Sequence, residues 1–167
     1  APKGSAFLYA HPEVQHLVEP LVVSWGWESE FPGPSRFIDE QEWTGTRDLS
    51  RFLAVPAAIR YQQQYDWPQV RARCHAILQD ALQRISRRYD LPLLHPDTPE
   101  WYAQMGTAQL PPQTDLVALK ARLYDEHRIE VPLIEWNGHK LVRISIQAYN
   151  TPAHVDGLLD ALDLLVR

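Results

Sequence analysis

Arg143 is the side chain whose type and setting best suit the binding of a carboxylate. It stands alone in the alternating segment Lys140-Leu-Val-Arg-Ile-Ser-Ile, which runs on into Tyr149-Asn150-Thr151. A guanidinium presents a planar fork of N–H donors that can hold both carboxylate oxygens at once, so it fixes orientation as well as adding binding energy. The strand taken alone favours an exposed arginine at a sheet edge. The carboxylate role therefore depends on the motif that follows.

A second candidate site is the turn-forming segment Trp43-Thr-Gly-Thr-Arg-Asp. Glycine allows a ligand to approach the backbone closely, while a hydroxyl and the free N–H groups at a helix start can donate to a phosphate dianion. Gly45 and Thr46 are therefore candidates for binding a phosphate group. A plain turn followed by a helix N-cap is the alternative interpretation.

Other chemistries find less support in the sequence. Lys3 would be a Schiff-base nucleophile only if it were buried and desolvated, and a solvated lysine is the alternative. The seven histidines show no metal-ligand spacing, and the single cysteine cannot complete a thiolate site, so we expect no metal. No serine, histidine and acidic set comes with a nucleophile elbow.

Composition excludes several classes of partner. The chain has 167 residues, 45% of them hydrophobic and 22% charged, which is globular composition. Its net charge of −5 provides no basic surface for nucleic acid or anionic lipid. No apolar run approaches the roughly 20 residues of a membrane span. With one cysteine, Cys74, in an amphipathic segment, we expect a reduced, soluble, cytoplasmic protein.

The first third of the chain is expected to combine short strands with a long loop. Residues 5–10 and 17–25 have β-rich composition, and residues 26–46 read as an irregular loop rich in aromatic residues. Asp48 is placed to begin a helix that continues through Ile59. A strand so near the first residue implies partners upstream of Ala1, or a processed or truncated chain.

The rest of the sequence predicts an antiparallel sheet with helices packed against it. Apolar residues at helical spacing follow Asp66, Asp115 and Thr151, and each of these three can act as an N-cap. The first of these helices ends near Tyr89. Residues 101–109 are predicted to form a strand. Asn137-Gly138 suits a type I′ turn, so 129–136 and 140–146 are predicted to form a hairpin.

Three segments carry a family resemblance: Pro2-Lys-Gly, the Gly45-Thr46 turn, and Arg-x-Ser followed by Tyr149-Asn-Thr. They resemble the C-terminal part of class V aminotransferases. Within that family the resemblance is closest to the isopenicillin N epimerase-like branch. These are fold-type I pyridoxal-phosphate enzymes. The resemblance implies mixed α/β and α+β structure: residues 1–60 would end the large cofactor-binding domain, and 61–167 would form a small α+β domain with an antiparallel sheet.

The resemblance also implies roles for individual residues. Arg143 would hold the substrate α-carboxylate with Asn150 beside it, and Gly45 and Thr46 would bind the phosphate of pyridoxal 5′-phosphate held by a neighbouring subunit. Lys3 matches a lysine that does not bind the cofactor. The Schiff-base lysine is therefore expected upstream of Ala1, in the other half of the same polypeptide, so no catalytic residue is expected here and the isolated chain is predicted to be inactive.

By the same resemblance the complete enzyme would be a homodimer with a shared active site that removes the Cα proton of an amino acid, as an epimerase does. A cysteine, selenocysteine or sulfoxide lyase of the same fold is one alternative, although the hairpin region 129–139 carries no cysteine for direct desulfuration. The other alternative is a non-catalytic interaction module that keeps the small-domain fold. Its support is the tryptophan-rich loop with Trp25, Trp27 and Trp43.

Overall fold

The chain divides into two compact units, Ala1–Gln64 and Tyr65–Arg167. We describe them from a computed structural model that covers residues 3–166. Pro2 of the Pro-Lys-Gly motif lies outside the described residues. The domain boundary expected after residue 60 lies within helix α3 (Val55–Gln64), and the observed division follows the end of that helix.

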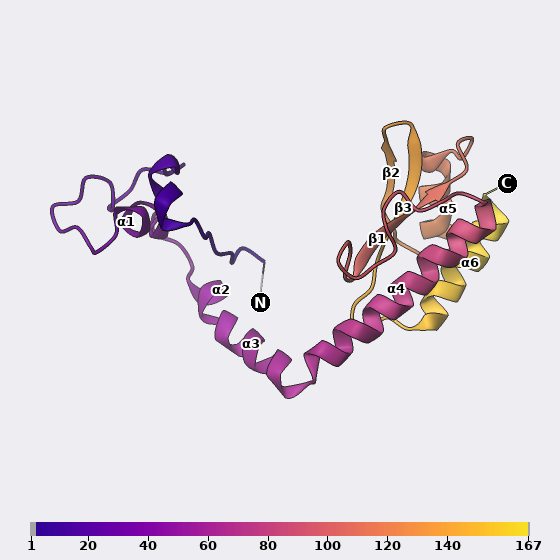
Figure 1. The fold of residues 1–167 in the computed structure, drawn as a ribbon, viewed down its shortest axis with the longest axis horizontal. Helices are drawn as coiled ribbons and strands as arrows, with labels where there is room; N and C mark the ends of the chain where they lie inside the picture. The colour runs from indigo at the N-terminus through magenta and orange to yellow at the C-terminus, as the bar shows by residue number, and fades with distance from the viewer. Residues whose placement is uncertain (1–2, 167) are drawn as a thin grey trace. The chain divides into compact units, whose positions relative to one another are not determined.

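The first unit consists of short helices joined by loops (Figure 1). Besides α3 they are the 3₁₀ helix η1 (Pro12–Leu17), α1 (Arg36–Glu42) and α2 (Ser50–Leu53). The Asp48 carboxylate accepts a hydrogen bond from the Ser50 N–H at 2.8 Å, which satisfies a donor at the start of α2. A helix therefore begins close to Asp48, as predicted, but its N-cap is Leu49 and it divides into α2 and α3.

Two other predictions for this unit are wrong. Residues 5–10 and 17–25 form no strand, and the predicted loop 26–46 contains α1. A strand is stable only when a neighbour completes its ladder of hydrogen bonds, and residues 3–64 supply no second strand. Helix α1 instead has a local signal, since the Ser35 hydroxyl accepts from the Ile38 N–H at 3.4 Å.

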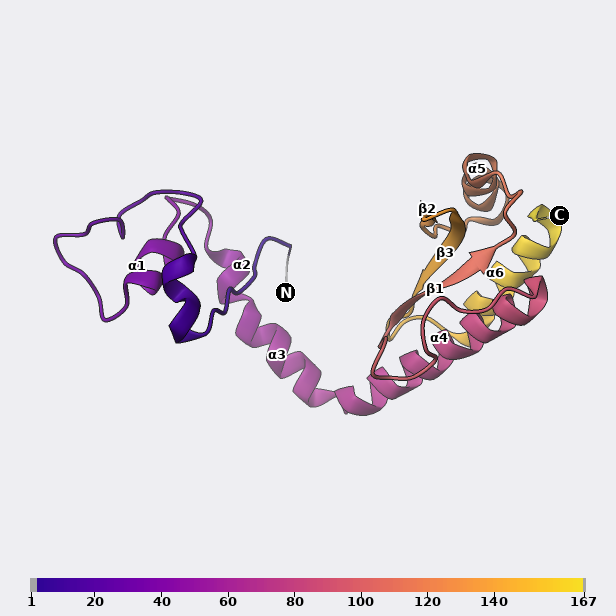
Figure 2. The same ribbon diagram turned by 45° about the horizontal axis from the view of Figure 1, so that its top comes forward.

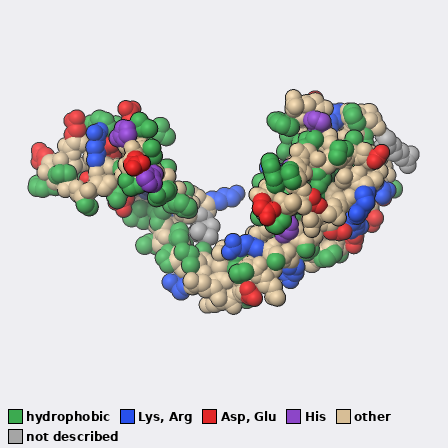
Figure 3. Space-filling view, viewed as in Figure 1, with side chains coloured by type: hydrophobic (Ala, Val, Ile, Leu, Met, Phe, Trp, Pro, Cys, Tyr) green, Lys and Arg blue, Asp and Glu red, His purple; other side chains and the backbone are tan. Residues whose placement is uncertain are grey.

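The first unit has no buried apolar residue among residues 3–64. Four of its large side chains are at least 86% exposed, namely Phe7, Leu21, Trp25 and Phe31. Hydrophobic side chains are spread over its visible face in Figure 3. Because apolar burial is the main driving force of folding, this unit does not have the core that a stable separate domain needs.

The second unit is a three-stranded antiparallel sheet packed with three helices (Figures 1 and 2). The strands are β1 (Met105–Leu110), β2 (Leu133–Trp136) and β3 (His139–Ser145), in the order β1-β3-β2. Strand β3 is thus central, and its Arg143 lies opposite Thr107 of β1. The expected mixture of helices with a small antiparallel sheet is confirmed.

The hairpin between β2 and β3 forms as the sequence predicts, but its first strand, predicted from residue 129, begins only at Leu133. Asn137 and Gly138 connect the strands with φ angles of 47° and 76°, and Trp136 pairs with His139. Two successive positive φ angles are what a type I′ turn requires, and glycine adopts them without a steric cost. The tight turn fixes the register between β2 and β3, the central strand that carries Arg143.

The helices of this unit are α4 (Trp67–Tyr89), α5 (Leu116–His127) and α6 (Pro152–Leu165). Asp66, Asp115 and Thr151 occupy the N-cap positions that the sequence predicts. Asp66 accepts from the Gln69 N–H at 3.4 Å, and Asp115 accepts from two N–H groups of α5 at 3.0 Å. None of the helices within residues 3–166 combines the length and apolarity needed to cross a membrane.

The core lies on one face of the sheet, where α4 and α6 run side by side (Figure 2). A methyl group at Gly106 of β1 would lie only 2.7 Å from the Leu82 side chain of α4, so strand and helix are in close contact. On β3, Val142 and Ile144 are buried in this core. Because side chains alternate along a strand, Arg143 projects from the other face.

A carboxylate anchors the segment between α4 and β1 to the helix. Asp97 accepts hydrogen bonds from Gln79 at 3.1 Å and Gln83 at 2.7 Å, both on α4, and from the Tyr102 hydroxyl. Burial raises the pKa of Asp97, but hydrogen bonds from Gln83, Tyr102 and Gln79 together outweigh it, so the pKa is lowered.

We predict that Asp97→Asn lowers the free energy of unfolding by about 2 kcal/mol at neutral pH, because charge-assisted hydrogen bonds are lost. Since folding lowers this pKa, the contribution is complete above the unfolded value of about 3.9 and disappears as the pH falls through the folded value. Urea unfolding of both proteins at several pH values measures the difference. Asp125→Asn on the exposed face of α5 is the control; an equal effect there would contradict the role of Asp97.

Candidate functional site

Arg143 borders a hollow of about 790 Å³ in the second unit. Three segments form its walls: the end of β3, the stretch 127–132 before β2, and the first turns of α6. The side of β3 is open here because β2 begins only at Leu133, opposite Val142. The Arg143 N–H still donates to the Pro132 carbonyl at 2.9 Å, and beyond that bond the two segments separate.

The guanidinium of Arg143 has an unused donor. Its Nε is buried and has no hydrogen-bond partner among the described residues. A buried N–H donor without a partner costs free energy, about 1 to 3 kcal/mol or more for a charged group. An arginine in this condition next to an open hollow is suited to a ligand with oxygen acceptors, and a carboxylate matches its geometry.

Asn150 lines the same hollow, but part of its side chain is already engaged. Its Oδ1 accepts from the Gln147 N–H at 2.8 Å, while its own N–H donates to the Gln147 carbonyl at 2.8 Å. The oxygen therefore holds the turn 147–150 closed. The amide NH₂ is the end of the side chain that can donate to a ligand. Asn150 therefore also has a structural role, which the sequence motif did not indicate.

The start of α6 lies directly after this turn. The Thr151 N–H donates to His154 Nδ1 at 3.3 Å, and Pro152 occupies the first helical position. Ala153 and His154 of this first turn line the hollow together with Arg143. The partial positive charge of a helix N-terminus adds to the attraction that Arg143 exerts on an anion.

Gly45 and Thr46 belong to the first unit. Gly45 has a φ angle of 115° and open space where a Cβ would lie, so its backbone is accessible to a ligand. Thr46 lines a hollow of about 340 Å³ with Trp25 and Trp43. This arrangement fits one contact to a phosphate. Lys3 is exposed and lacks the desolvation that would make it a nucleophile.

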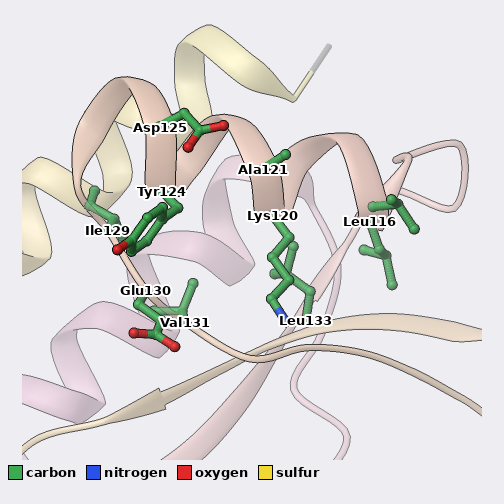
Figure 4. A pocket seen from close by; sticks show the side chains of 10 residues that line it. Leu116, Lys120, Ala121, Tyr124, Asp125, Ile129, Glu130, Val131 and Leu133 are labelled. Carbon is green, nitrogen blue, oxygen red and sulfur yellow. The ribbon is translucent and has the colours of Figure 1, made fainter.

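Sequence reasoning missed a groove between α5 and the segment that leads into β2 (Figure 4). It has a volume of about 520 Å³, and its side chains are mainly apolar. Lys120 and Tyr124 of α5 point toward the segment that carries Glu130 and Val131. Segment 129–131 lines this groove and also the hollow beside Arg143. No sequence motif marks it, because its residues are mainly apolar and stand at ordinary helix and strand spacing.

Within residues 3–166, no cluster of histidine, cysteine and acidic side chains is arranged to hold a metal ion. Cys74 is a free thiol buried in α4, where it is 1% exposed. Reactive cysteines occupy partly exposed positions, so this thiol is a packing residue.

Comparison with known proteins gives relatives over nearly the whole chain. Isopenicillin N epimerase of Streptomyces clavuligerus is 35% identical across 99% of this chain, and that of Amycolatopsis lactamdurans is 34% identical across 97%. A probable chloroplastic L-cysteine desulfhydrase of Arabidopsis thaliana is 29% identical across 100%. The chain spans 44%, 43% and 38% of these proteins' lengths, respectively. No protein-family model matches it.

The hydrogen bond from Gln147 to Asn150 predicts different effects for two substitutions. Asn150→Asp keeps the acceptor and retains stability, whereas Asn150→Ala removes it and lowers the free energy of unfolding by about 1 kcal/mol. Urea denaturation of the 167-residue chain measures both. Equal stability of the Ala variant and the parent would show that this turn does not depend on the Asn150 side chain.

Proposed function

Because this chain belongs to the class V aminotransferase family, we propose that it is the carboxylate-binding C-terminal part of a pyridoxal-phosphate enzyme that acts on an amino acid. In this proposal residues 1–60 end the large cofactor-binding domain and 61–167 form the small domain. The lysine that binds the cofactor belongs to the upstream half of the polypeptide, so the isolated chain is inactive.

The proposal rests chiefly on the unpartnered Nε of Arg143. A buried guanidinium donor beside a hollow of about 790 Å³ is most simply explained by a ligand that supplies its acceptors. We assign the substrate α-carboxylate to this position. Asn150 contributes its free amide NH₂, and the start of α6 adds a favourable electrostatic field. With the carboxylate held at two points, the Cα–H bond is oriented for proton removal.

Gly45 and Thr46 are the residues of this chain that would bind the cofactor phosphate. The accessible backbone at Gly45 and the exposed position of Thr46 support this role. When bound, pyridoxal phosphate withdraws electrons from the substrate Cα and thereby acidifies its proton. We propose that this contact is made to the cofactor of a neighbouring subunit in a homodimer.

The apolar surface of the first unit supports its assignment to a larger domain. Residues 3–64 bury no apolar side chain of their own and expose many large ones, and extensive exposed apolar surface marks an interface. The remainder of a longer polypeptide would cover it. A non-catalytic interaction module would also need such a surface, but it would leave the unpartnered donor of Arg143 without a purpose.

Within this proposal, proton removal at Cα followed by epimerisation is the leading reaction, since two of the relatives are named isopenicillin N epimerase. A lyase is the second candidate, and the observation that favours it is the similarity to a probable L-cysteine desulfhydrase. The buried position of Cys74 argues against a mechanism in which a cysteine of this chain accepts sulfur.

We expect Arg143→Ala to raise the KM for the amino-acid substrate by about 30-fold or more in the protein of natural length, since about 2 kcal/mol or more is lost with a charged hydrogen-bonded contact. The KM of Arg143→Lys should lie between those of the unmodified protein and Arg143→Ala, because lysine keeps the positive charge but not the planar pair of N–H donors. Arg122→Ala is the control, since Arg122 pairs with Glu126 on α5. An unchanged KM in Arg143→Ala would remove Arg143 from the site.

A further inference from the structure

Tyr149 lines two hollows near the end of the central strand. It lines the hollow of about 790 Å³ beside Arg143 and also a second hollow of about 550 Å³ on the β1 side, to which Gln104 and Met105 contribute. Ser145 and Ile146 line both hollows as well, so the two are adjacent. Its side chain is nevertheless 78% exposed.

The backbone that carries this ring is firmly held. Besides the two hydrogen bonds between Gln147 and Asn150, the Ala148 N–H donates to the Gln147 side-chain oxygen at 2.8 Å. The Ala148 carbonyl accepts from Arg73 of α4 at 3.1 Å, which ties the turn to the core. A rigid turn that presents an aromatic ring loses little conformational entropy when a ligand contacts that ring.

The lining of the hollow suits a substrate with an apolar side chain. Ile129, Val131 and Pro132 contribute apolar side chains to this lining, and Tyr149 belongs to it as well. Pockets of about 300 to 1,000 Å³ accommodate ligands of drug size, so a hollow of about 790 Å³ also has room for a bulky side chain. An aromatic ring beside apolar side chains completes a site for such a group.

We propose that Tyr149 is a specificity-determining residue, whose ring contacts the side chain of the amino acid that Arg143 holds by its carboxylate, and that it favours substrates with bulky apolar side chains. This inference rests on the carboxylate role of Arg143 in the proposed function. The ring, rather than the hydroxyl, makes the contact. Tyr149→Phe therefore retains the preference, whereas Tyr149→Ala loses most of it.

The test uses two carboxylates that lack an amino group and therefore cannot react with the cofactor: propanoate and phenylpropanoate. Their dissociation constants are measured by calorimetry with the protein of natural length. We expect the unmodified protein to bind phenylpropanoate about tenfold more tightly, as aromatic burial predicts. Tyr149→Ala should lose most of this preference, because only the apolar side chains of the segment 129–132 are left to contact the phenyl group. Trp136→Ala is the matched control, because Trp136 is 60% exposed on the hairpin and lines neither hollow.

The outcomes separate this inference from the proposed function. If Arg143→Ala weakens both ligands while Tyr149→Ala keeps the tenfold preference, Tyr149 is not a specificity residue and the role of Arg143 stands. If the unmodified protein shows no preference, the inference is likewise overturned. If Arg143→Ala weakens neither ligand, the carboxylate role fails, and the inference that rests on it fails too. Circular dichroism verifies that each variant is folded.

Discussion

The burial of one face of the central strand is the constraint on which the site depends. Val142 and Ile144 are held in a core shared with α4 and α6, and the strict alternation of a strand then places Arg143 on the opposite face. A slip of one residue would exchange the two sets of side chains. The tight turn at Asn137-Gly138 prevents such a slip, so a local turn preference fixes the position of a charged group.

The same sheet leaves an opening at the end of the strand. Strand β2 pairs with β3 only from Leu133 onward, and the preceding segment diverges after the bond between Arg143 and Pro132. The opening places the guanidinium, the turn 147–150 and the start of α6 around one hollow. A fold with a longer β2 would have closed this space with backbone pairing. The short strand is therefore part of what makes the site.

Local signals in the sequence predicted much of the second unit. Carboxylates at Asp66 and Asp115 mark helix starts because they satisfy free N–H groups, and Asn137-Gly138 permits positive φ angles. The strands proposed within residues 5–25 were wrong because strand formation depends on distant partners, which β-rich composition does not reveal. Likewise, the motif identified Arg143 and Asn150, but only the structure shows an unpartnered Nε and an engaged amide oxygen.

The two units differ in what they need from the rest of the protein. The second has a core of its own, whereas residues 3–64 expose their apolar side chains. Such a surface is stable only when another part of a polypeptide or a partner covers it. This difference fits a chain that spans 44% of the length of an epimerase relative.

Borohydride treatment of the protein of natural length tests the central claim most directly. If the chain is part of a pyridoxal-phosphate enzyme, the purified protein absorbs visible light, and reduction abolishes that band by fixing the cofactor to a lysine. Mass spectrometry of the peptides should locate this lysine outside residues 1–167. A colourless protein without bound phosphate would contradict the claim, and a modified Lys3 would contradict the placement of the catalytic lysine.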